Sequence, residues 1–194
     1  KTIATKLLGT SVVKNALRTM GTPFLYRPSR ILGAMGTKNN QETTWTDRLD
    51  AENITPYRPG MAGCFRCPVN CRPLNDLHGD PDDKYGRGDG PEYVTLGKFG
   101  PNLGIDRLES VIRLNNICND LGLDTASAGS MIAWSMELFQ RGIITLKDTG
   151  GIDLTWGQAD VVEQLLFMMA RREGFGNVLA DSTRAVERGH FPPE

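Results

Sequence analysis

The chain has little histidine, no excess of positive charge and no long apolar stretch. Lys and Arg number 22 against 23 Asp and Glu, so the formal charge of −1 offers no electrostatic surface for DNA or RNA. No apolar run approaches the roughly 20 residues that span a bilayer, and residues 1–6 lack the apolar core and cleavage site of a signal peptide. We therefore expect a cytoplasmic protein that binds neither nucleic acid nor membrane.

Cysteine is also scarce, and its distribution argues against a secreted disulfide framework. Three of the four cysteines are clustered and Cys118 stands apart, a pattern that favours metal binding in a reducing compartment. With 194 residues, of which 39% are hydrophobic, the chain can bury one core. It begins without Met and ends in a linker-like Phe-Pro-Pro-Glu, so we expect one domain of a larger protein.

Apolar residues recur at helical spacing over much of the sequence. Residues 106–121, 124–141, 156–173 and 178–188 each predict a helix, with glycines such as Gly122 placed to end them, and residues 2–20 predict an amphipathic helix. Residues 155–158 have the form of a capping box. Weaker helical stretches lie near Arg30 and at 47–51, and residues 69–74 and 92–96 could be short strands. We expect an all-α fold over residues 1–194: an irregular helical bundle with a cysteine-bearing loop and at most a few short strands.

The clustered cysteines are the strongest chemical signal. Cys64, Cys67 and Cys71 have the spacing C-x2-C-x3-C, so their thiolates can converge on one metal centre from a single tight turn. Thiolates are the preferred ligands of both zinc and iron-sulfur clusters, and both centres usually need four ligands. One ligand is therefore missing from this segment.

Two interpretations of the cysteines stay open at this point. The first is a structural zinc knuckle completed by Cys118, His78 or His190. The chain has no second C-x2-C or H-x3-H pair, which weakens this interpretation because structural zinc sites usually combine two such pairs. The second is an iron-sulfur cluster. Cys118 could equally be a buried thiol that behaves as a small hydrophobe.

Two further segments carry polar groups that could serve a cofactor. Residues 119–125 join the end of one predicted helix to the start of the next, with Gly122 and Asp124 at C-cap and N-cap positions. Plain capping explains this junction, although its free carbonyl and amide groups would also suit a pterin. Glu92 follows a Gly-Pro pair; facing a closed metal site, it could transfer protons.

Together these motifs resemble the tungsten- and pterin-dependent aldehyde ferredoxin oxidoreductase family. The resemblance rests on residues 63–71, 90–93, 102–105 and 118–125, extends upstream to 37–41, and covers nearly the whole chain. It implies the helical middle domain of that enzyme. The family's N-terminal β domain and C-terminal helical domain would then be absent from this chain.

The resemblance also implies roles for individual residues. Cys64, Cys67 and Cys71 would ligate a four-iron four-sulfur cluster, with the fourth cysteine supplied by the C-terminal domain. The segment with Asn119, Gly122, Leu123 and Asp124 matches the family's D-x-x-G-L-(C/D) motif, which contacts a pterin of a tungsten or molybdenum bis-pterin cofactor. Asn119 replaces the usual aspartate. Glu92 would assist proton transfer near the metal.

The implied activity is oxidation of an aldehyde to a carboxylic acid, with electrons leaving through the cluster to ferredoxin or an iron-sulfur electron-transfer subunit. A homo-oligomer is compatible with this interpretation. Two alternatives are a related tungsten enzyme that reduces an aromatic thioester and a non-catalytic helical zinc module.

Overall fold

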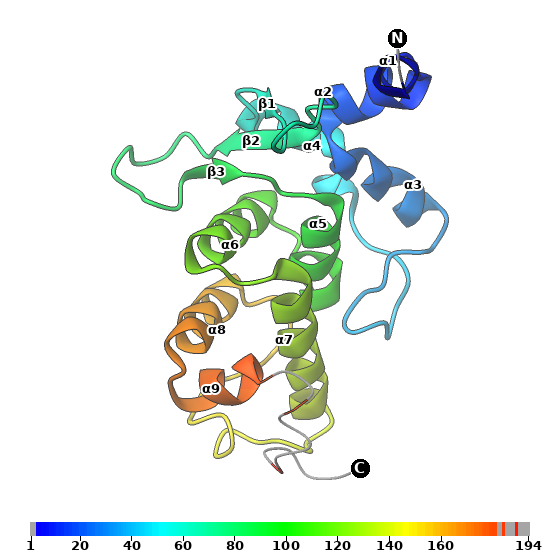
Figure 1. Cartoon of the computed structure of the whole chain (residues 1–194). Helices are drawn as coiled ribbons and strands as arrows, with labels where there is room; N and C mark the ends of the chain where they lie inside the picture. The colour runs from blue at the N-terminus through cyan, green and yellow to red at the C-terminus, as the bar shows by residue number, and fades with distance from the viewer. Residues whose placement is uncertain (1–2, 182–183, 185–188, 190–194) are drawn as a thin grey trace.

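Helices make up most of the structure, and a small antiparallel sheet lies near its N-terminal end (Figure 1). The computed structural model describes residues 3–181, 184 and 189. The helices are α1 (Ile3–Leu8), α2 (Arg18–Met20), α3 (Tyr26–Ile31), α4 (Ala51–Ile54), α5 (Tyr93–Phe99), α6 (Leu108–Leu121), α7 (Thr125–Gln140), α8 (Ala159–Arg171) and α9 (Gly174–Ala180). The strands are β1 (Met61–Ala62), β2 (Arg72–Asp76) and β3 (Arg87–Asp89). The fold is therefore mostly helical, as expected, with a small sheet added.

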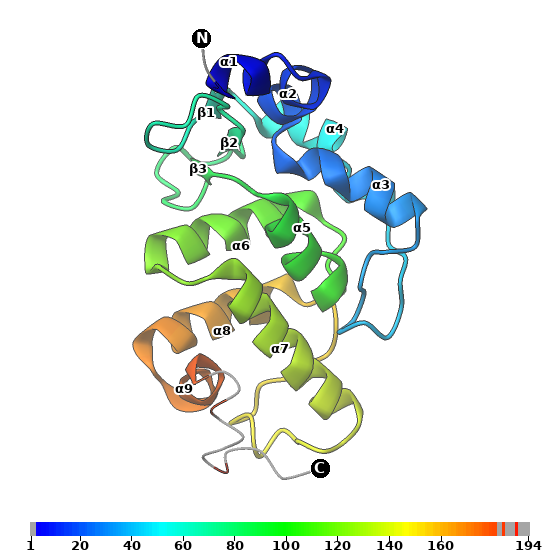
Figure 2. The same ribbon diagram turned by 45° about the vertical axis from the view of Figure 1, so that its right-hand side comes forward.

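The core lies between α5, α6, α7 and α8. Their inward faces carry fully buried apolar side chains such as Leu96, Ile112, Ile132 and Leu165, and Figure 2 shows α6 between the sheet and α8. The predicted helices at 106–121 and 124–141 are confirmed to within three residues at each end. Strong periodicity and clear end signals explain this agreement, because Gly122 ends α6 in the left-handed conformation at φ 68°.

The helix predicted at 156–173 is confirmed as α8 to within three residues at each end, whereas the helix predicted at 178–188 begins at a different residue. Helix α8 begins at Ala159, and its N-cap Gln158 makes no side-chain capping bond, so the capping box predicted at 155–158 is wrong. The Thr155 hydroxyl instead donates to Asp153 at 2.6 Å. Helix α9 begins four residues earlier than the predicted start at 178, and most of the predicted range beyond 181 lies outside the described residues.

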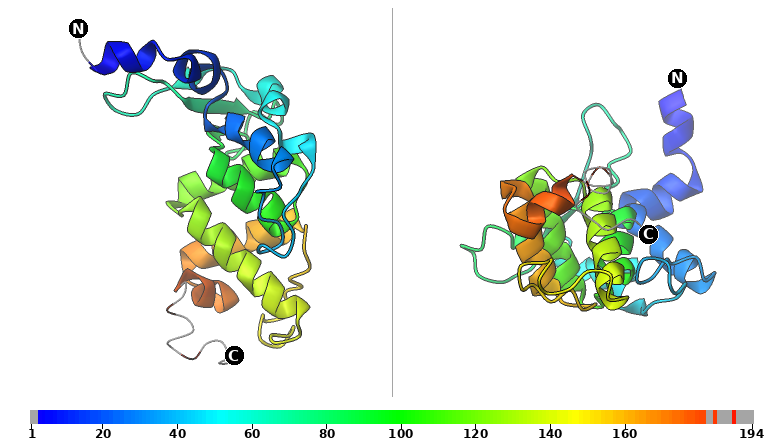
Figure 3. Two further views of the ribbon diagram at one scale, coloured as in Figure 1. Left: turned by 90° about the vertical axis from the view of Figure 1, so that its right-hand side faces the viewer. Right: turned by 90° about the horizontal axis from the view of Figure 1, so that it is seen from below.

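The predicted N-terminal helix at 2–20 is interrupted. Helix α1 ends at Leu8, and the Thr10 hydroxyl then donates to the Leu7 carbonyl oxygen at 2.8 Å instead of continuing the helix. Helical backbone resumes at Ser11 and continues through a π-helical stretch at Val13–Leu17 into α2. Glycine at position 9 and a threonine that bonds locally both weaken a helix interior. Helix α1 consequently projects from the body of the molecule (Figure 3).

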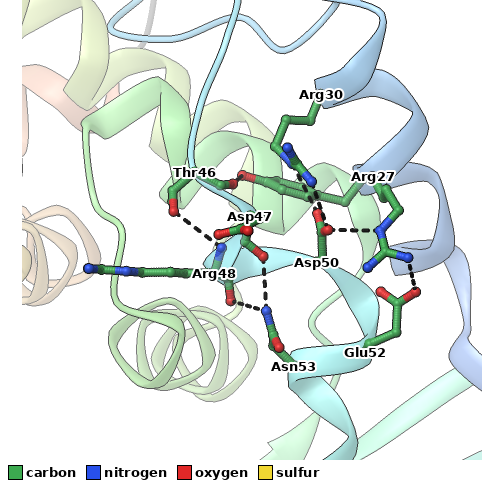
Figure 4. A network of polar contacts seen from close by, with 9 residues as sticks. Arg27, Arg30, Thr46, Asp47, Arg48, Asp50, Glu52 and Asn53 are labelled. Atoms are coloured by element: carbon green, nitrogen blue, oxygen red, sulfur yellow. Dashed lines mark hydrogen bonds and ion pairs between the residues drawn. The ribbon is translucent and has the colours of Figure 1, made fainter.

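Two short helical segments of the N-terminal part of the chain are joined by ion pairs. Both were predicted as weak helical stretches, and they appear as α3 and as a 3-10 turn at Asp47–Leu49 that leads into α4. Buried Asp50 accepts hydrogen bonds from Arg27 Nε at 2.9 Å and Arg30 Nη2 at 2.9 Å (Figure 4). These bonds fasten α3 to α4.

The sheet has the order β1-β2-β3, and both pairs are antiparallel. Met61 lies opposite Pro73, and Leu74 lies opposite Asp89. Strand β2 overlaps the predicted strand at 69–74. The strand predicted at 92–96 is wrong, since this segment forms α5; a short apolar run fits either element. Within the described part of the chain, no helix has the length and apolar character needed to span a membrane.

Candidate cofactor and metal site

The three predicted cysteine ligands lie in the loop between β1 and β2. The Cys67 amide donates to the Cys64 carbonyl oxygen at 2.9 Å, so these two residues enclose one tight turn. Arg66 and Asn70 adopt left-handed backbone angles, φ 58° and 54°, which turn the chain between the cysteines. Cys64 is exposed and the other two are half-buried, and all three thiols are free. The loop therefore leaves its thiols available to a ligand.

Cys71 lies in the electrostatic neighbourhood of Glu92. Burial raises the pKa of the Cys71 thiol, and the charge of Glu92 raises it further, with smaller effects from Cys67 and Cys64. The cysteine loop and the predicted catalytic carboxylate of Glu92 are therefore close enough to interact electrostatically. In the part of the chain that the structure describes, no three His, Cys, Asp or Glu side chains stand in an arrangement that could hold a metal ion. A shared metal centre at the three cysteines thus stays a prediction.

Of the residues considered as a fourth ligand, the structure describes Cys118 and His78. Cys118 is in α6 with no exposed surface, and burial raises its pKa to about 12, with a further effect of Asp124. Its thiol is therefore a core group. His78 Nε2 lies 2.9 Å from the Pro56 carbonyl oxygen, and His190 is outside the described residues.

A cleft of about 750 Å³ brings together three other predicted site residues. It opens between β3, the start of α5, the end of α6 and the start of α7, and Glu92, Asn119 and Asp124 all line it. These residues are far apart in the sequence, and the path of β3 over α6 and into α5 joins them (Figure 1). The volume falls within the range of small-molecule and cofactor pockets. The cleft is thus the best candidate for a cofactor site.

The remaining two residues of the predicted pterin motif do not line this cleft. Gly122 ends α6, and the side chain of Leu123 packs on the core and lines a separate groove of about 310 Å³. Asp124 caps α7 by accepting a hydrogen bond from the Ser127 amide at 2.6 Å. Hydrogen bonds from Ser127 lower the pKa of Asp124. Plain capping is therefore confirmed at this junction, and Asp124 also faces the cleft.

Asn115, Asn116 and Asn119 line the cleft, and Asn75 bonds to Asn116 beside them; we call these four residues the asparagine clamp. Asn75 and Asn116 are buried and exchange two hydrogen bonds, at 2.9 and 2.8 Å. Asn75 Nδ2 also donates to the Gly90 carbonyl oxygen at 3.1 Å. These bonds tie β2 to α6 and to the segment that leads to Glu92.

The other two members of the clamp hold the end of β3. Asn115 Nδ2 and Asn119 Nδ2 donate to the Asp89 carbonyl oxygen at 2.6 and 2.9 Å. Because the amide nitrogens are committed in this way, the Oδ1 atoms of Asn115 and Asn119 are left as acceptors, without a donor among the described residues. Both side chains line the cleft. The cleft therefore presents two amide acceptors to a ligand.

Close contact with the clamp requires glycine in β3 and directly after it. A Cβ atom on Gly88 would overlap Asn116 Oδ1, and one on Gly90, where φ is 94°, would lie 2.9 Å from Asn115 Oδ1. The sequence analysis missed Asn75, Asn115 and Asn116. The usable signal was the unusual density of asparagine in α6 opposite a Gly-Asp-Gly segment.

Positive charge at the cleft was also missed by the sequence analysis. Arg72, Lys84 and Arg87 line the cleft, each paired with one carboxylate. Arg72 Nη1 lies 3.2 Å from Asp89 Oδ2, while its Nε is shielded from solvent and has no partner among the described residues. An arginine directly after the third cysteine of the motif was the available signal. Buried donors normally have an acceptor, so the unpartnered Nε of Arg72 is a position where a ligand could supply one.

Comparison with known proteins assigns the family. A family model described as "Aldehyde ferredoxin oxidoreductase, domains 2 & 3" matches residues 1–190. The chain belongs to the aldehyde ferredoxin oxidoreductase family. The resemblance stated from the motifs is therefore confirmed.

Two relatives within the aldehyde ferredoxin oxidoreductase family match nearly the whole chain. Tungsten-containing aldehyde ferredoxin oxidoreductases of Pyrococcus furiosus and Thermococcus kodakarensis are 36% and 33% identical, over 97% of this chain and 31% of their own length in both cases. The WOR-like subunit of an aliphatic sulfonate oxidoreductase of Pyrococcus furiosus is 36% identical over 61% of this chain and 19% of its own. The chain thus spans less than a third of these relatives.

The fold also occurs in a solved structure, the active-site complex BamBC of benzoyl coenzyme A reductase with 1,5-dienoyl-CoA. The match has a TM-score of 0.60 and 23% identity, and covers 75% of this chain and 21% of that chain. At this level of identity the likeness shows the shared fold alone.

The cleft fits the kind of cofactor that the aldehyde ferredoxin oxidoreductase family implies, a tungsten-pterin. A pterin carries ring N–H donors and an anionic phosphate. The cleft offers amide acceptors on Asn115 and Asn119, a free donor on Arg72, and cationic Lys84 and Arg87. The cysteine loop, which leads directly into cleft-lining Arg72, carries thiols whose deprotonated form is the ligand type that iron-sulfur clusters take.

Proposed function

We propose that this chain is part of a tungsten-pterin oxidoreductase that oxidises an aldehyde to a carboxylic acid. The reaction balances as RCHO + H2O → RCOOH + 2 H+ + 2 e−. The observation that carries the proposal is that Glu92 and the Asn119 segment line one cleft and that the charge of Glu92 acts on Cys71 of the cysteine loop, within a chain of the aldehyde ferredoxin oxidoreductase family. The full activity belongs to the longer protein, since this chain spans 31% of its relatives.

The side chains of the cleft would hold and orient the cofactor. Asn115 and Asn119 would accept hydrogen bonds from the pterin ring, and Arg72 would donate from Nε to an anionic group. Asp124 would remain the cap of α7 at the cleft wall. When bound, the tungsten-pterin supplies the two-electron redox chemistry of the reaction.

Glu92 would accept a proton that the oxidation releases. Its carboxylate lines the cleft and is only partly exposed, at the start of α5, where a bound substrate and water could reach it. A carboxylate in such a position typically contributes a factor of about 10² to 10⁴ through general base catalysis. This role fits an aldehyde substrate, because its oxidation with water to the carboxylic acid releases two protons.

Electrons would leave through a four-iron four-sulfur cluster held by Cys64, Cys67 and Cys71, with a fourth cysteine from another part of the full protein. We propose ferredoxin or an iron-sulfur subunit as the acceptor. The core position of Cys118 supports an external fourth ligand. The same position weakens the alternative of a self-contained zinc module.

The test uses the full-length protein, purified without oxygen, with metal analysis and an absorption spectrum. Expected are roughly four irons with tungsten or molybdenum, a brown absorbance bleached by dithionite, and aldehyde-dependent reduction of a viologen dye. Glu92→Gln should lower kcat by about 10² or more and retain both metals, whereas Glu42→Gln, an exposed surface change, should match the wild type. One zinc and no iron would overturn the oxidoreductase proposal, and activity only with aromatic thioesters would overturn the aldehyde assignment.

A further inference from the structure

The orientation of the Glu92 carboxylate depends on a hydroxyl 70 residues away in the sequence. The Tyr93 amide donates to Thr22 Oγ1 at 2.9 Å, and Thr22 Oγ1 donates to Glu92 Oε2. A threonine hydroxyl has one proton. Because the Tyr93 amide occupies a lone pair of the oxygen, that proton is directed to the carboxylate.

This chain of bonds assigns different roles to the two carboxylate oxygens. Oε2 accepts the hydroxyl proton and is therefore the unprotonated oxygen of the group. Oε1 has no hydrogen-bond partner among the residues that the structure describes, and Glu92 lines the cleft. Oε1 is thus the oxygen that is free to take up a proton from a molecule in the cleft.

Thr22 is itself held against the cysteine loop. The residue before it, Gly21, has a φ of 71°, and a Cβ atom there would lie 2.6 Å from the Cys71 carbonyl oxygen. Thr22 begins a 3-10 turn at Thr22–Leu25, and the next residue, Pro23, is buried. The dipeptide Gly21-Thr22 therefore contacts the backbone of Cys71 through Gly21 and the Glu92 side chain through Thr22.

We propose that Thr22 is a positioning residue for Glu92. Its hydroxyl keeps the carboxylate in one rotamer with Oε1 facing the cleft, and it fixes the distance of that carboxylate from the cysteine loop. The proposal rests on the proposed function of Glu92 in proton transfer. A misplacement of about 1 Å in a catalytic group costs up to about 10²-fold in rate, so loss of the hydroxyl should lower kcat by about tenfold to a hundredfold.

The test compares Thr22→Val and Thr22→Ser in the full-length holoenzyme. Valine keeps the shape and removes the hydroxyl, whereas serine restores it. Thr22→Val should lower kcat as stated with little change in KM and with unchanged iron and tungsten content, and Thr22→Ser should recover most of the rate. Thr19→Val is the matched control, because the Thr19 hydroxyl donates to the Asn15 and Ala16 carbonyl oxygens of the π-helical stretch directly before it.

A readout independent of activity is amide hydrogen exchange of the peptide that contains Tyr93. Exchange should be faster in Thr22→Val and return toward the wild-type rate in Thr22→Ser, because the Tyr93 amide loses and regains its acceptor. If the valine variant does not load its metals, Thr22→Ala, which is smaller, replaces it in the same comparison.

A double-mutant cycle separates the two proposals. If Glu92→Gln lowers kcat and Thr22→Val adds nothing in that background, Thr22 acts through Glu92. If Glu92→Gln lowers kcat but Thr22→Val does not, the positioning role is wrong and the role of Glu92 stands. If Glu92→Gln leaves kcat unchanged, the role of Glu92 is wrong, and the positioning role with it.

Discussion

Substitution of Asp50 should lower the stability of the protein more than substitution of most other charged residues in this chain. Its side chain is 3% exposed and is held by Arg27, 50% exposed, and Arg30, 23% exposed. A hydrogen bond to a charged group contributes about 1.5–3 kcal/mol, and the exposed part of Arg27 recovers hydration when the bond is lost. We therefore expect Asp50→Asn to destabilise the protein by about 2–4 kcal/mol, since Asn has one acceptor oxygen and turns donors toward two guanidinium groups.

The assay is the urea midpoint of the full-length protein, combined with hydrogen exchange of the segment 47–54. Glu52→Gln is the matched control, because Glu52 pairs with the same Arg27 at 2.8 Å but is 50% exposed. An exposed ion pair contributes less than about 1 kcal/mol. Equal effects of the two substitutions would refute the reasoning.

The pH dependence of this difference gives a second check. Burial alone would raise the pKa of Asp50, but the hydrogen bonds from Arg30 and Arg27 outweigh it and hold the pKa below its usual value. A carboxyl with a lowered folded-state pKa stabilises the protein above its unfolded pKa of about 3.9, and this contribution is lost as the pH falls through the folded pKa. The stability difference between wild type and Asp50→Asn should thus be full near neutrality and shrink in acid.

Three further predictions concern the candidate site. Cys71→Ser in the full-length protein should abolish the cluster, measured as loss of iron and of the brown absorbance; retained absorbance would remove Cys71 from the ligands. Gly88→Ala should lower the free energy of unfolding by about 1–3 kcal/mol and lower tungsten retention, because the added Cβ atom would overlap Asn116 Oδ1. An unfolding midpoint equal to that of the wild type would contradict this contact. Asn119→Asp should also lower tungsten retention, measured by metal analysis after gel filtration, because it replaces the donor to the Asp89 carbonyl by a carboxylate; unchanged retention would show that this bond does not shape the cleft.

Sequence patterns predicted the parts of the fold that depend on local signals. Helices α6 and α7 have long apolar stripes and clear ends, and the junction at Gly122 and Asp124 forms as its residue types indicate. Helix α5 was missed because its first amide is satisfied by the Thr22 hydroxyl, which no nearby residue predicts. Contacts of this kind depend on the tertiary fold.

In the candidate site, too, residues in local motifs could be predicted from the sequence, whereas residues brought together by the tertiary fold could not. The cysteine spacing, Glu92 and the Asn119 segment are visible in the sequence because each lies in a short motif. Lys84 lies in a polar loop and Arg87 on a short strand, and nothing in the sequence distinguishes either residue from an ordinary surface charge. Only the pairing of β2 with β3 brings them to the cleft beside Arg72.

The one departure from the family motif follows from the clamp. The resemblance leads one to expect aspartate at position 119, and a carboxylate there could not donate to the Asp89 carbonyl oxygen. It would also add a negative charge to a cleft that Asp120 and Asp124 already line. Asparagine keeps an acceptor for the ligand and supplies the donor that holds β3, the strand from which the chain runs directly to Glu92. In this chain Asn119 therefore supports the backbone that leads to Glu92 and also lines the cleft.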